Sequence, residues 1–186
     1  MSIFSFVKRY FTRPRTVGAI LPSSKYLAKL MIKRVNFATA TTIAEFGPGT
    51  GAFTRQILAA RNKDTIVILI ERDKLFFDIL MKEFHTTPNV ILINDSAENI
   101  VPHLHARGIQ SIDYIISGLP FASLPTSTAE NILCEVKKIL DGEFVTFQYS
   151  MYKKKLFDSF FSNIEIAREY RNIPPAYVLY CKADNK

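Results

Sequence analysis

Short apolar runs alternate along the chain with segments whose apolar residues recur at helical spacing. The run at 65–70 is almost wholly apolar and β-branched, which is typical of a strand that is covered on both faces. Alternating strands and helices predict a doubly wound, mostly parallel sheet, and two final strands with no helix between them predict an antiparallel hairpin. One helix is expected to end at Asp141-Gly142. We expect strands at 42–46, 65–70, 90–93, 112–116, 143–148, 164–170 and 176–182, and helices at 53–60, 74–85, 127–140 and near 153–161.

An amphipathic pattern occupies residues 2–12, and Pro14 ends the helix that this pattern predicts. Basic and aromatic residues side by side are typical of a helix that lies in the plane of a membrane surface. The alternative is a helix that packs its aromatic face on the rest of the protein. The apolar face consists of Ile3, Phe4, Phe6, Val7, Tyr10 and Phe11, with Lys8 and Arg9 beside it.

A second helix is expected to follow, capped by Ser23 or Ser24 and running to about Val35. We therefore divide the chain into an N-terminal helical segment, 1–36, and a sheet domain, 37–186. The inner face of the second helix is expected to contain Leu27, Leu30 and Met31.

The positive charge of the chain is concentrated near its start. The net charge is +7, yet residues 1–44 contain eight Lys or Arg and no acidic residue, the first of which is Glu45. The remaining residues include sixteen basic and seventeen acidic side chains, a net charge of −1. The N-terminal segment should therefore bind a polyanion, either an anionic membrane or nucleic acid.

Composition places the chain among ordinary globular proteins. With 186 residues and 48% apolar content it can bury one full core, and we find neither a bilayer-spanning run nor a signal peptide. Cys134 and Cys181 are expected to be buried free thiols, which indicates a cytoplasmic protein. His85, His103 and His105 show no metal-binding spacing beyond a weak 103/105 pair, so we expect loop or surface histidines and no metal.

A glycine-rich segment lies between the first expected strand and the next helix. It reads Glu45-Phe46-Gly47-Pro48-Gly49-Thr50-Gly51. Glycine adopts positive φ and has no side chain, so such a turn lets a nucleotide-like cofactor approach the backbone. The spacing differs from the G-x-G-x-x-G of nicotinamide enzymes and resembles motif I of the class I S-adenosylmethionine-dependent methyltransferases. The fold expected is therefore the Rossmann-like α/β fold of that class, with seven strands and helices on both faces of the sheet.

Acidic residues follow the second and third expected strands, and the carboxyl ends of parallel strands are where ligands bind. Glu71 is placed to accept bonds from both ribose hydroxyls, and Asp95 is placed to accept a bond from an adenine amine. A strand-end acid alone is more often a helix cap, but the three strand-end acids Glu45, Glu71 and Asp95 together with a glycine loop indicate S-adenosylmethionine. The expected cofactor-binding residues are Glu45, Gly47, Pro48, Gly49, Gly51, Glu71, Arg72, Asp95, Ser96, Ala97 and Ser117.

The segment after the fourth expected strand reads Ser117-Gly118-Leu119-Pro120-Phe121. It resembles the N-L-P-Y signature of the ribosomal RNA adenine dimethyltransferases, in which Asn accepts a hydrogen from the target amine and Tyr stacks on the base. Here Gly118 stands in place of the Asn and Phe121 in place of the Tyr. Glycine has no side chain to accept that bond, which counts against a flipped-base mechanism.

Motifs along nearly the whole chain resemble the soluble bacterial phospholipid N-methyltransferases. Besides motif I, they are Gly18-Ala19-Ile20-x-Pro22-Ser23-Ser24, Ile70-Glu71-Arg72, Ser117-Gly118-Leu119-Pro120 and Arg171-Asn172-Ile173-Pro174-Pro175-Ala176. The resemblance implies methylation of phosphatidylethanolamine by S-adenosylmethionine at the inner face of the membrane. It also implies docking on anionic lipid through the N-terminal helix, for which the candidates are Phe4, Val7, Lys8, Arg9 and Phe11.

The acceptor would be a lipid amine beside a phosphate. Aromatic faces tolerate the quaternary ammonium product, so Phe121, Tyr149 and Tyr152 are candidates, each with core or rim packing as the alternative. Arg171 is a candidate for the headgroup phosphate. No general base is evident, and positioning of the amine is the main requirement. The residues expected beside the transferred methyl group are Ser117, Gly118, Leu119, Pro120 and Tyr149.

Two other functions stay open at this point. The first is a nucleic-acid methyltransferase whose basic N-terminal segment binds phosphates. The second is a membrane-associated protein that binds the cofactor without catalysis. An aromatic amphipathic helix favours lipid over RNA, and the intact set of strand-end residues favours catalysis. The sequence makes no prediction of the oligomeric state.

Overall fold

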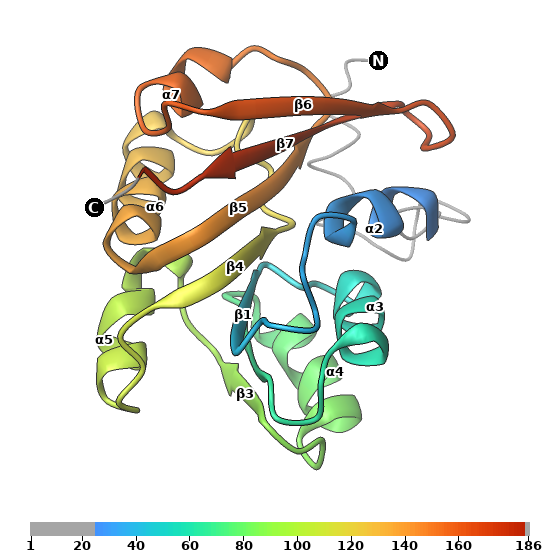
Figure 1. The fold of residues 1–186 in the computed structure, drawn as a ribbon, viewed down its shortest axis with the longest axis vertical. Helices are drawn as coiled ribbons and strands as arrows, with labels where there is room; N and C mark the ends of the chain where they lie inside the picture. Colours follow the sequence, from blue (N-terminus) through green and yellow to red (C-terminus); the bar gives the residue numbers. More distant parts are fainter. Residues whose placement is uncertain (1–24, 185–186) are drawn as a thin grey trace.

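A seven-stranded sheet organises residues 25–184, the part of the chain that the computed structural model describes (Figure 1). The strand order is β3-β2-β1-β4-β5-β7-β6, and only β7 runs antiparallel to its neighbours. This is the expected mostly parallel sheet with a closing hairpin. The strands are β1 (Thr42–Phe46), β2 (Ile66–Ile70), β3 (Val90–Ile93), β4 (Ile112–Ser117), β5 (Leu140–Gln148), β6 (Ile164–Glu169) and β7 (Ala176–Lys182).

Helices cover both faces of the sheet, as the sequence predicted (Figure 1). One buried cluster joins the sheet to α5, α6 and α7, and a second joins its other face to α2, α3 and α4. Successive side chains of a strand point to opposite faces, so Ile43 lies in one cluster while Ala44 and Phe46 lie in the other. The helices are α2 (Lys25–Ile32), α3 (Ala52–Ala60), α4 (Lys74–Phe84), η1 (Ala97–Asn99), α5 (Ile100–His105), α6 (Thr126–Ile139) and α7 (Lys154–Asp158).

The expected bounds agree with most elements and differ in a few. The expectation that a helix ends at Asp141-Gly142 is wrong, because α6 ends at Ile139 and both residues lie inside β5. A Cβ atom at Gly142 would lie 2.2 Å from the carbonyl oxygen of Asp113, so this glycine permits close strand contact at the register shift between β4 and β5. Helix α2 ends at Ile32, before the expected Val35, and α5 was not expected at all.

Some expectations concern residues 1–24, which lie outside the described part. They are the amphipathic helix at 2–12, the motif at 18–24 and the cap at Ser23 or Ser24. Within residues 25–184, no helix is long and apolar enough to cross a bilayer. Cys181 is buried as expected, whereas Cys134 is exposed on α6, so the expectation for that thiol is wrong.

The carboxyl ends of the parallel strands meet at one edge of the sheet, which we call the carboxyl edge. The loop between β6 and β7 reaches the same edge, because Tyr177 at the start of β7 pairs with Gln148 at the end of β5. Figure 1 shows this loop projecting beyond the strands on the side where α2 lies. The glycine-rich segment and the segment after β4 therefore share an edge with the β6–β7 loop.

Candidate active site

The glycine-rich loop connects the end of β1 to the start of α3. Its three glycines all have positive φ, which other residues rarely adopt: 66° at Gly47, 57° at Gly49 and 81° at Gly51. A Cβ atom at Gly49 would have no neighbouring atom within 4 Å, so the backbone here is open to a ligand. Helix α3 begins at this loop with no side-chain cap, which leaves its first N–H groups available.

Glu71, directly after β2, holds the glycine loop. One carboxylate oxygen accepts a hydrogen bond from the backbone N–H of Gly49 at 3.0 Å, and the other accepts from the N–H of Asp73 at 2.8 Å. Burial raises the pKa of Glu71, while these backbone donors act in the opposite direction. The side chain thus connects the residues after β2 to the glycine loop at Gly49.

Glu45 is fully buried within β1, on the face that α3 covers. Its Oε2 atom accepts a hydrogen bond from the Thr54 hydroxyl at 2.6 Å. Its Oε1 atom has no hydrogen-bond partner among the described residues. Burial raises the pKa of Glu45 to about 8, and the nearby Glu71 carboxylate adds to this shift. A buried carboxyl oxygen beside the glycine loop thus has a hydrogen-bonding capacity that the described residues do not satisfy.

Replacing Glu45 by glutamine should stabilise the cofactor-free protein in a pH-dependent way. The folded-state pKa of about 8 lies above the ordinary value of 4.5, so wild-type stability is complete below pH 4.5 and declines as the pH rises toward 8. Glutamine cannot ionise. We compare the free energy of unfolding of the variant with that of the wild type at each pH. We expect this difference to favour the variant by about 2–4 kcal/mol more at pH 8 than at pH 4.5. Denaturant titrations at both pH values measure this, and an equal difference at the two would contradict it.

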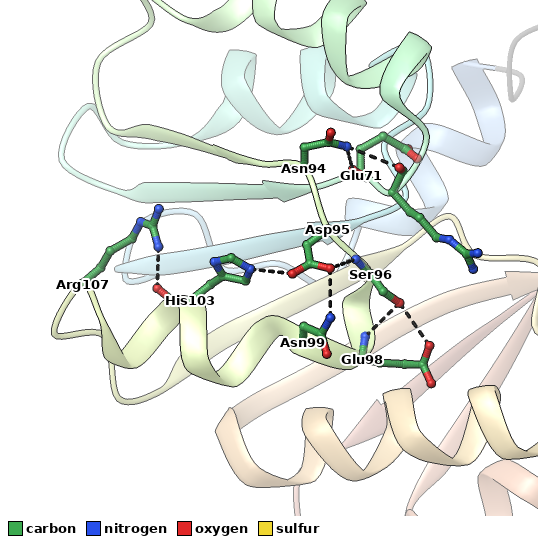
Figure 2. A network of polar contacts seen from close by, with 9 residues as sticks. Glu71, Asn94, Asp95, Ser96, Glu98, Asn99, His103 and Arg107 are labelled. Carbon is green, nitrogen blue, oxygen red and sulfur yellow. Dashed lines mark hydrogen bonds and ion pairs between the residues drawn. The ribbon is translucent and has the colours of Figure 1, made fainter.

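Asn94 and Asp95 follow β3 and connect it to its neighbours (Figure 2). The Asn94 amide donates to the carbonyl oxygen of Glu71 at 2.8 Å, which ties the ends of β2 and β3 together. Asp95 accepts from the Ser96 N–H at 2.7 Å and from the Asn99 amide at 2.9 Å. Its other carboxylate oxygen lies 2.8 Å from Nε2 of His103 on α5. These contacts, that of His103 first, lower the pKa of Asp95, so its carboxylate is ionised and oriented.

Three further residues of the expected cofactor set are neighbours of this network in the chain, and Figure 2 labels one of them, Ser96. Ser96 caps η1, since its hydroxyl accepts from the Glu98 N–H at 3.4 Å. Ala97 is buried, and Arg72 is exposed with its carbonyl oxygen 3.3 Å from the Asn94 amide. The sequence placed His103 in a loop or on the surface, and no local pattern connects it with Asp95 eight positions earlier.

The segment after β4 contacts the glycine loop backbone to backbone. The N–H of Gly118 donates to the carbonyl oxygen of Phe46 at 2.8 Å, and Ser117 before it is fully buried. A Cβ atom at Gly118 would lie only 2.7 Å from the carbonyl oxygen of Gly47. Leu119 lies over the loop from the same segment, so a Cβ atom at Gly47 would lie 2.7 Å from its Cδ2 atom. An asparagine side chain therefore does not fit at Gly118 unless one backbone moves.

The aromatic candidates occupy very different environments. Phe121 is fully buried, and its ring packs edge-on against Phe144 and Phe157 with centroids 6.1 and 5.2 Å apart. Its expected place in an acceptor site is corrected, because the ring belongs to the core. Tyr149 is partly exposed at the end of β5, whereas Tyr152 is 83% exposed in the next loop.

Two residues shape this edge in ways that the sequence did not predict. Gln148, buried at the end of β5, accepts a hydrogen bond from the Ala122 N–H at 3.1 Å and so anchors the segment after β4. The available signal was a polar residue ending an otherwise apolar strand. Arg171, the phosphate candidate, donates to Glu169 through Nε at 2.9 Å and Nη2 at 3.0 Å. Its charge is therefore already shared with a carboxylate.

Comparisons with known proteins agree with this geometry. No family model matches the chain. An ornithine lipid N-methyltransferase from Singulisphaera acidiphila is 28% identical over 183 residues, which cover 96% of this chain and 95% of that protein. A probable ribosomal RNA small subunit methyltransferase A from Thermococcus gammatolerans is 29% identical over 116 residues, 62% of this chain and 40% of that protein. A solved S-adenosylmethionine-dependent methyltransferase from Aquifex aeolicus superposes with a TM-score of 0.67 at 14% identity, covering 99% of this chain and all of that one.

The fold and these relatives define the class of the protein. The chain is an S-adenosylmethionine-dependent methyltransferase with the Rossmann-like fold of class I. The residues at the carboxyl edge fit that cofactor: the Gly49 backbone is open, Glu45 has an unpartnered buried oxygen, and Asp95 is an oriented carboxylate. Within the described residues, no group of three or more His, Cys, Asp or Glu side chains could hold a metal ion.

Proposed function

We propose that this protein methylates the amine of a membrane phospholipid headgroup of the phosphatidylethanolamine type. The observation that carries the proposal is Gly118: a Cβ atom there would lie 2.7 Å from the Gly47 carbonyl oxygen. The segment beside the expected methyl position therefore offers backbone groups, and no side-chain amide, to an acceptor. A relative of nearly equal length that is named an ornithine lipid N-methyltransferase supports a lipid amine as acceptor.

In this proposal the strand-end residues hold the cofactor. Glu71 accepts hydrogen bonds from the ribose hydroxyls, and Asp95 accepts one from the adenine amine. Glu45 binds a hydrogen-bond donor or the positively charged group of the methionine part of the cofactor. The backbone of the glycine loop, with Pro48, lines the same site. When bound, S-adenosylmethionine supplies an electrophilic methyl group on its sulfonium. The remaining members of the proposed cofactor site are Arg72, Ser96, Ala97 and Ser117.

The residues of the acceptor side position an amine and exclude water. In the segment Ser117-Gly118-Leu119-Pro120, the carbonyl groups of Leu119 and Pro120 already accept from backbone N–H groups of the following turn. The carbonyl group of Gly118 is therefore the proposed acceptor that orients the amine. Tyr149 and Tyr152 provide aromatic faces for a product that becomes a quaternary ammonium. Arg171 binds the headgroup phosphate through guanidinium N–H groups other than those that it donates to Glu169. No step requires a side-chain base if the amine arrives unprotonated.

A second candidate function is methylation of ribosomal RNA, since several relatives carry that name. Those matches span 40% and 59% of the relatives' own lengths. Two features favour lipid over RNA. Gly118 cannot accept a hydrogen bond from a base amine through a side chain, and Phe121 is buried and so cannot stack on a flipped base.

We further propose that segment 1–36 docks the domain 37–186 on the inner face of the membrane, so that the protein is cytoplasmic and peripheral. Deleting residues 2–12 should then abolish most sedimentation with anionic vesicles, because the deletion removes the apolar face and both basic residues. Cofactor affinity by calorimetry should be unchanged, since Glu71 and Asp95 remain. Wild-type sedimentation by the deletion variant would rule out this helix as the anchor.

The substrate proposal is tested with vesicles that present different headgroup nitrogens: a free amine beside a phosphate, the same nitrogen as an amide, and a free amine on a lipid without phosphate. Purified protein and methyl-labelled S-adenosylmethionine are offered phosphatidylethanolamine, N-acylated phosphatidylethanolamine or ornithine lipid in the same anionic background. Label is expected in the first lipid and not in the second, whose nitrogen is an amide. Label in ornithine lipid alone would contradict the proposed headgroup, while a lipid amine would still be the acceptor. Label in none of the three would contradict the proposal.

A further inference from the structure

The loop between β6 and β7, residues 170–175, exposes large apolar side chains. We call this loop the hairpin tip. Tyr170 is 67% exposed and Ile173 is 76% exposed, and Tyr26 on the adjoining helix α2 is 44% exposed. Large apolar groups that are gathered at a projecting loop, rather than scattered singly, indicate a contact surface.

Hydrogen bonds hold the hairpin tip in one conformation. The Glu169 carboxylate accepts from the backbone N–H of Arg171 at 2.9 Å and also pairs with its guanidinium. The same guanidinium lies over the ring of Tyr26, 4.1 Å from its centroid, which ties the tip to α2. The Asn172 amide donates to the carbonyl oxygen of Pro174 at 2.8 Å. Because the backbone is braced, Tyr170 and Ile173 are presented outward by the fold.

The charge around these side chains is positive. Arg168 lies over the rings of Tyr170 and Tyr177, 4.8 Å from each centroid, and Arg171 contributes a second guanidinium against the single carboxylate of Glu169. Tyrosine rings with arginine beside an exposed aliphatic residue are the composition of protein segments at the boundary between headgroups and acyl chains. Anionic lipids attract such a segment electrostatically.

The tip also lies where a membrane would need to be. It shares the carboxyl edge of the sheet with the glycine loop and the segment after β4, because Gln148 at the end of β5 pairs with Tyr177. Figure 1 shows the tip projecting beyond the strands at that edge. A bilayer that touches the tip therefore lies on the side of the sheet where the candidate active site is.

We propose that the hairpin tip inserts Tyr170 and Ile173 into the interface of an anionic bilayer, as a second membrane contact besides the N-terminal segment. The inference rests on the proposed lipid substrate. It adds an orientation, because a single membrane contact leaves the domain free to rotate, whereas two contacts hold the carboxyl edge of the sheet toward the headgroups. The occupant of this surface is the bilayer itself, chosen because exposed apolar groups and basic groups occur together here.

The chain contains no tryptophan, so one introduced tryptophan reports on a single site. The full-length variant Ile173→Trp is mixed with vesicles of phosphatidylglycerol and phosphatidylcholine, without cofactor. Its emission should move to shorter wavelength, and brominated lipids should quench most of it. The control Met81→Trp introduces the probe in α4, two turns after the start of that helix. The Met81 side chain is 36% exposed. Its emission should change little.

Two outcomes overturn the inference. In the first, the Ile173→Trp protein sediments with the vesicles while its emission stays that of a probe in water. In the second, the emission is already at short wavelength without vesicles and bromolipids do not quench it, which would mean that another part of the chain covers the tip. Neither lipid is a methyl acceptor of the proposed kind, so failure of the proposed reaction leaves this measurement intact.

A second measurement uses a double variant with less apolar surface. Changing Tyr170 and Ile173 to serine should lower the vesicle partition coefficient roughly ten- to a hundredfold, since burying side chains of this size contributes one or two decades. Met81→Ser is the matched control and should partition like the wild type. Both positions of the double variant are exposed, and unchanged cofactor affinity by calorimetry checks that it folds. An unchanged partition coefficient would contradict the insertion.

Discussion

Replacing Glu71 by alanine should weaken S-adenosylmethionine binding by roughly a hundredfold or more. The change removes an acceptor of two charge-assisted hydrogen bonds, each of which contributes about 1.5–3 kcal/mol. It also releases the glycine loop, because the Glu71 carboxylate holds the Gly49 N–H at 3.0 Å. Isothermal calorimetry with the cofactor measures the loss directly.

The control for this variant is Glu83→Ala. Glu83 is also a carboxylate, but its two oxygens accept from the guanidinium of Arg55 on α3, at 2.7 and 2.6 Å, whereas those of Glu71 accept from the backbone of Gly49 and Asp73. Its removal should leave cofactor affinity at the wild-type value. Because Glu71 is buried, its replacement could disturb the fold. Cooperative thermal unfolding of the variant is therefore measured as well, to show that it is folded. A folded Glu71→Ala protein with wild-type affinity would remove this residue from the cofactor site.

Replacing Gly118 by alanine should lower kcat/KM for methyl transfer by about a hundredfold. The added methyl group would lie 2.7 Å from the carbonyl oxygen of Gly47. The backbone of residue 118 fixes the position of this Cβ atom and the oxygen is itself backbone, so no side-chain rotation relieves the contact. The two loops must then separate by a few tenths of an ångström to an ångström. Displacements of that size at a reacting centre cost about a hundredfold in rate. Steady-state kinetics on the accepted substrate measure the effect.

Gly108→Ala is the matched control for this second variant. Gly108 also lies in a loop, and an added Cβ atom would contact nothing within 4 Å. Its φ of 73° makes alanine strained there, so about 1 kcal/mol of stability should be lost while kcat/KM stays the same. Equal activity of Gly118→Ala and this control would show that methyl transfer does not depend on the close contact between the two loops.

Local signals predicted the sheet well because each strand is bounded by turn residues and filled with apolar ones. The bounds of β1 and β3 agree with the expected 42–46 and 90–93 for this reason. The expected end of α6 was wrong because Asp141-Gly142 resembles the residues that commonly follow a helix. In the fold, Gly142 is needed where β5 passes close to Asp113 on β4, a contact between residues far apart in the chain.

The same distinction holds for the site. Strand order brings Glu71 and Asp95 to one edge, so their grouping follows from the alternation of strands and helices alone. The contact of His103 with Asp95 depends on how α5 packs, and α5 itself was not expected. The burial of Phe121 depends on partners from β5 and α7, which motif spacing does not reveal.

The most direct test of the account is competition between the two acceptor classes in one tube. Wild-type protein receives methyl-labelled S-adenosylmethionine together with anionic vesicles that contain phosphatidylethanolamine and with small-subunit ribosomal RNA, and the two are then separated by solvent extraction. We expect the label in the lipid phase, on headgroups that carry one or more new methyl groups. Label in the RNA with none in the lipid would contradict the proposed function.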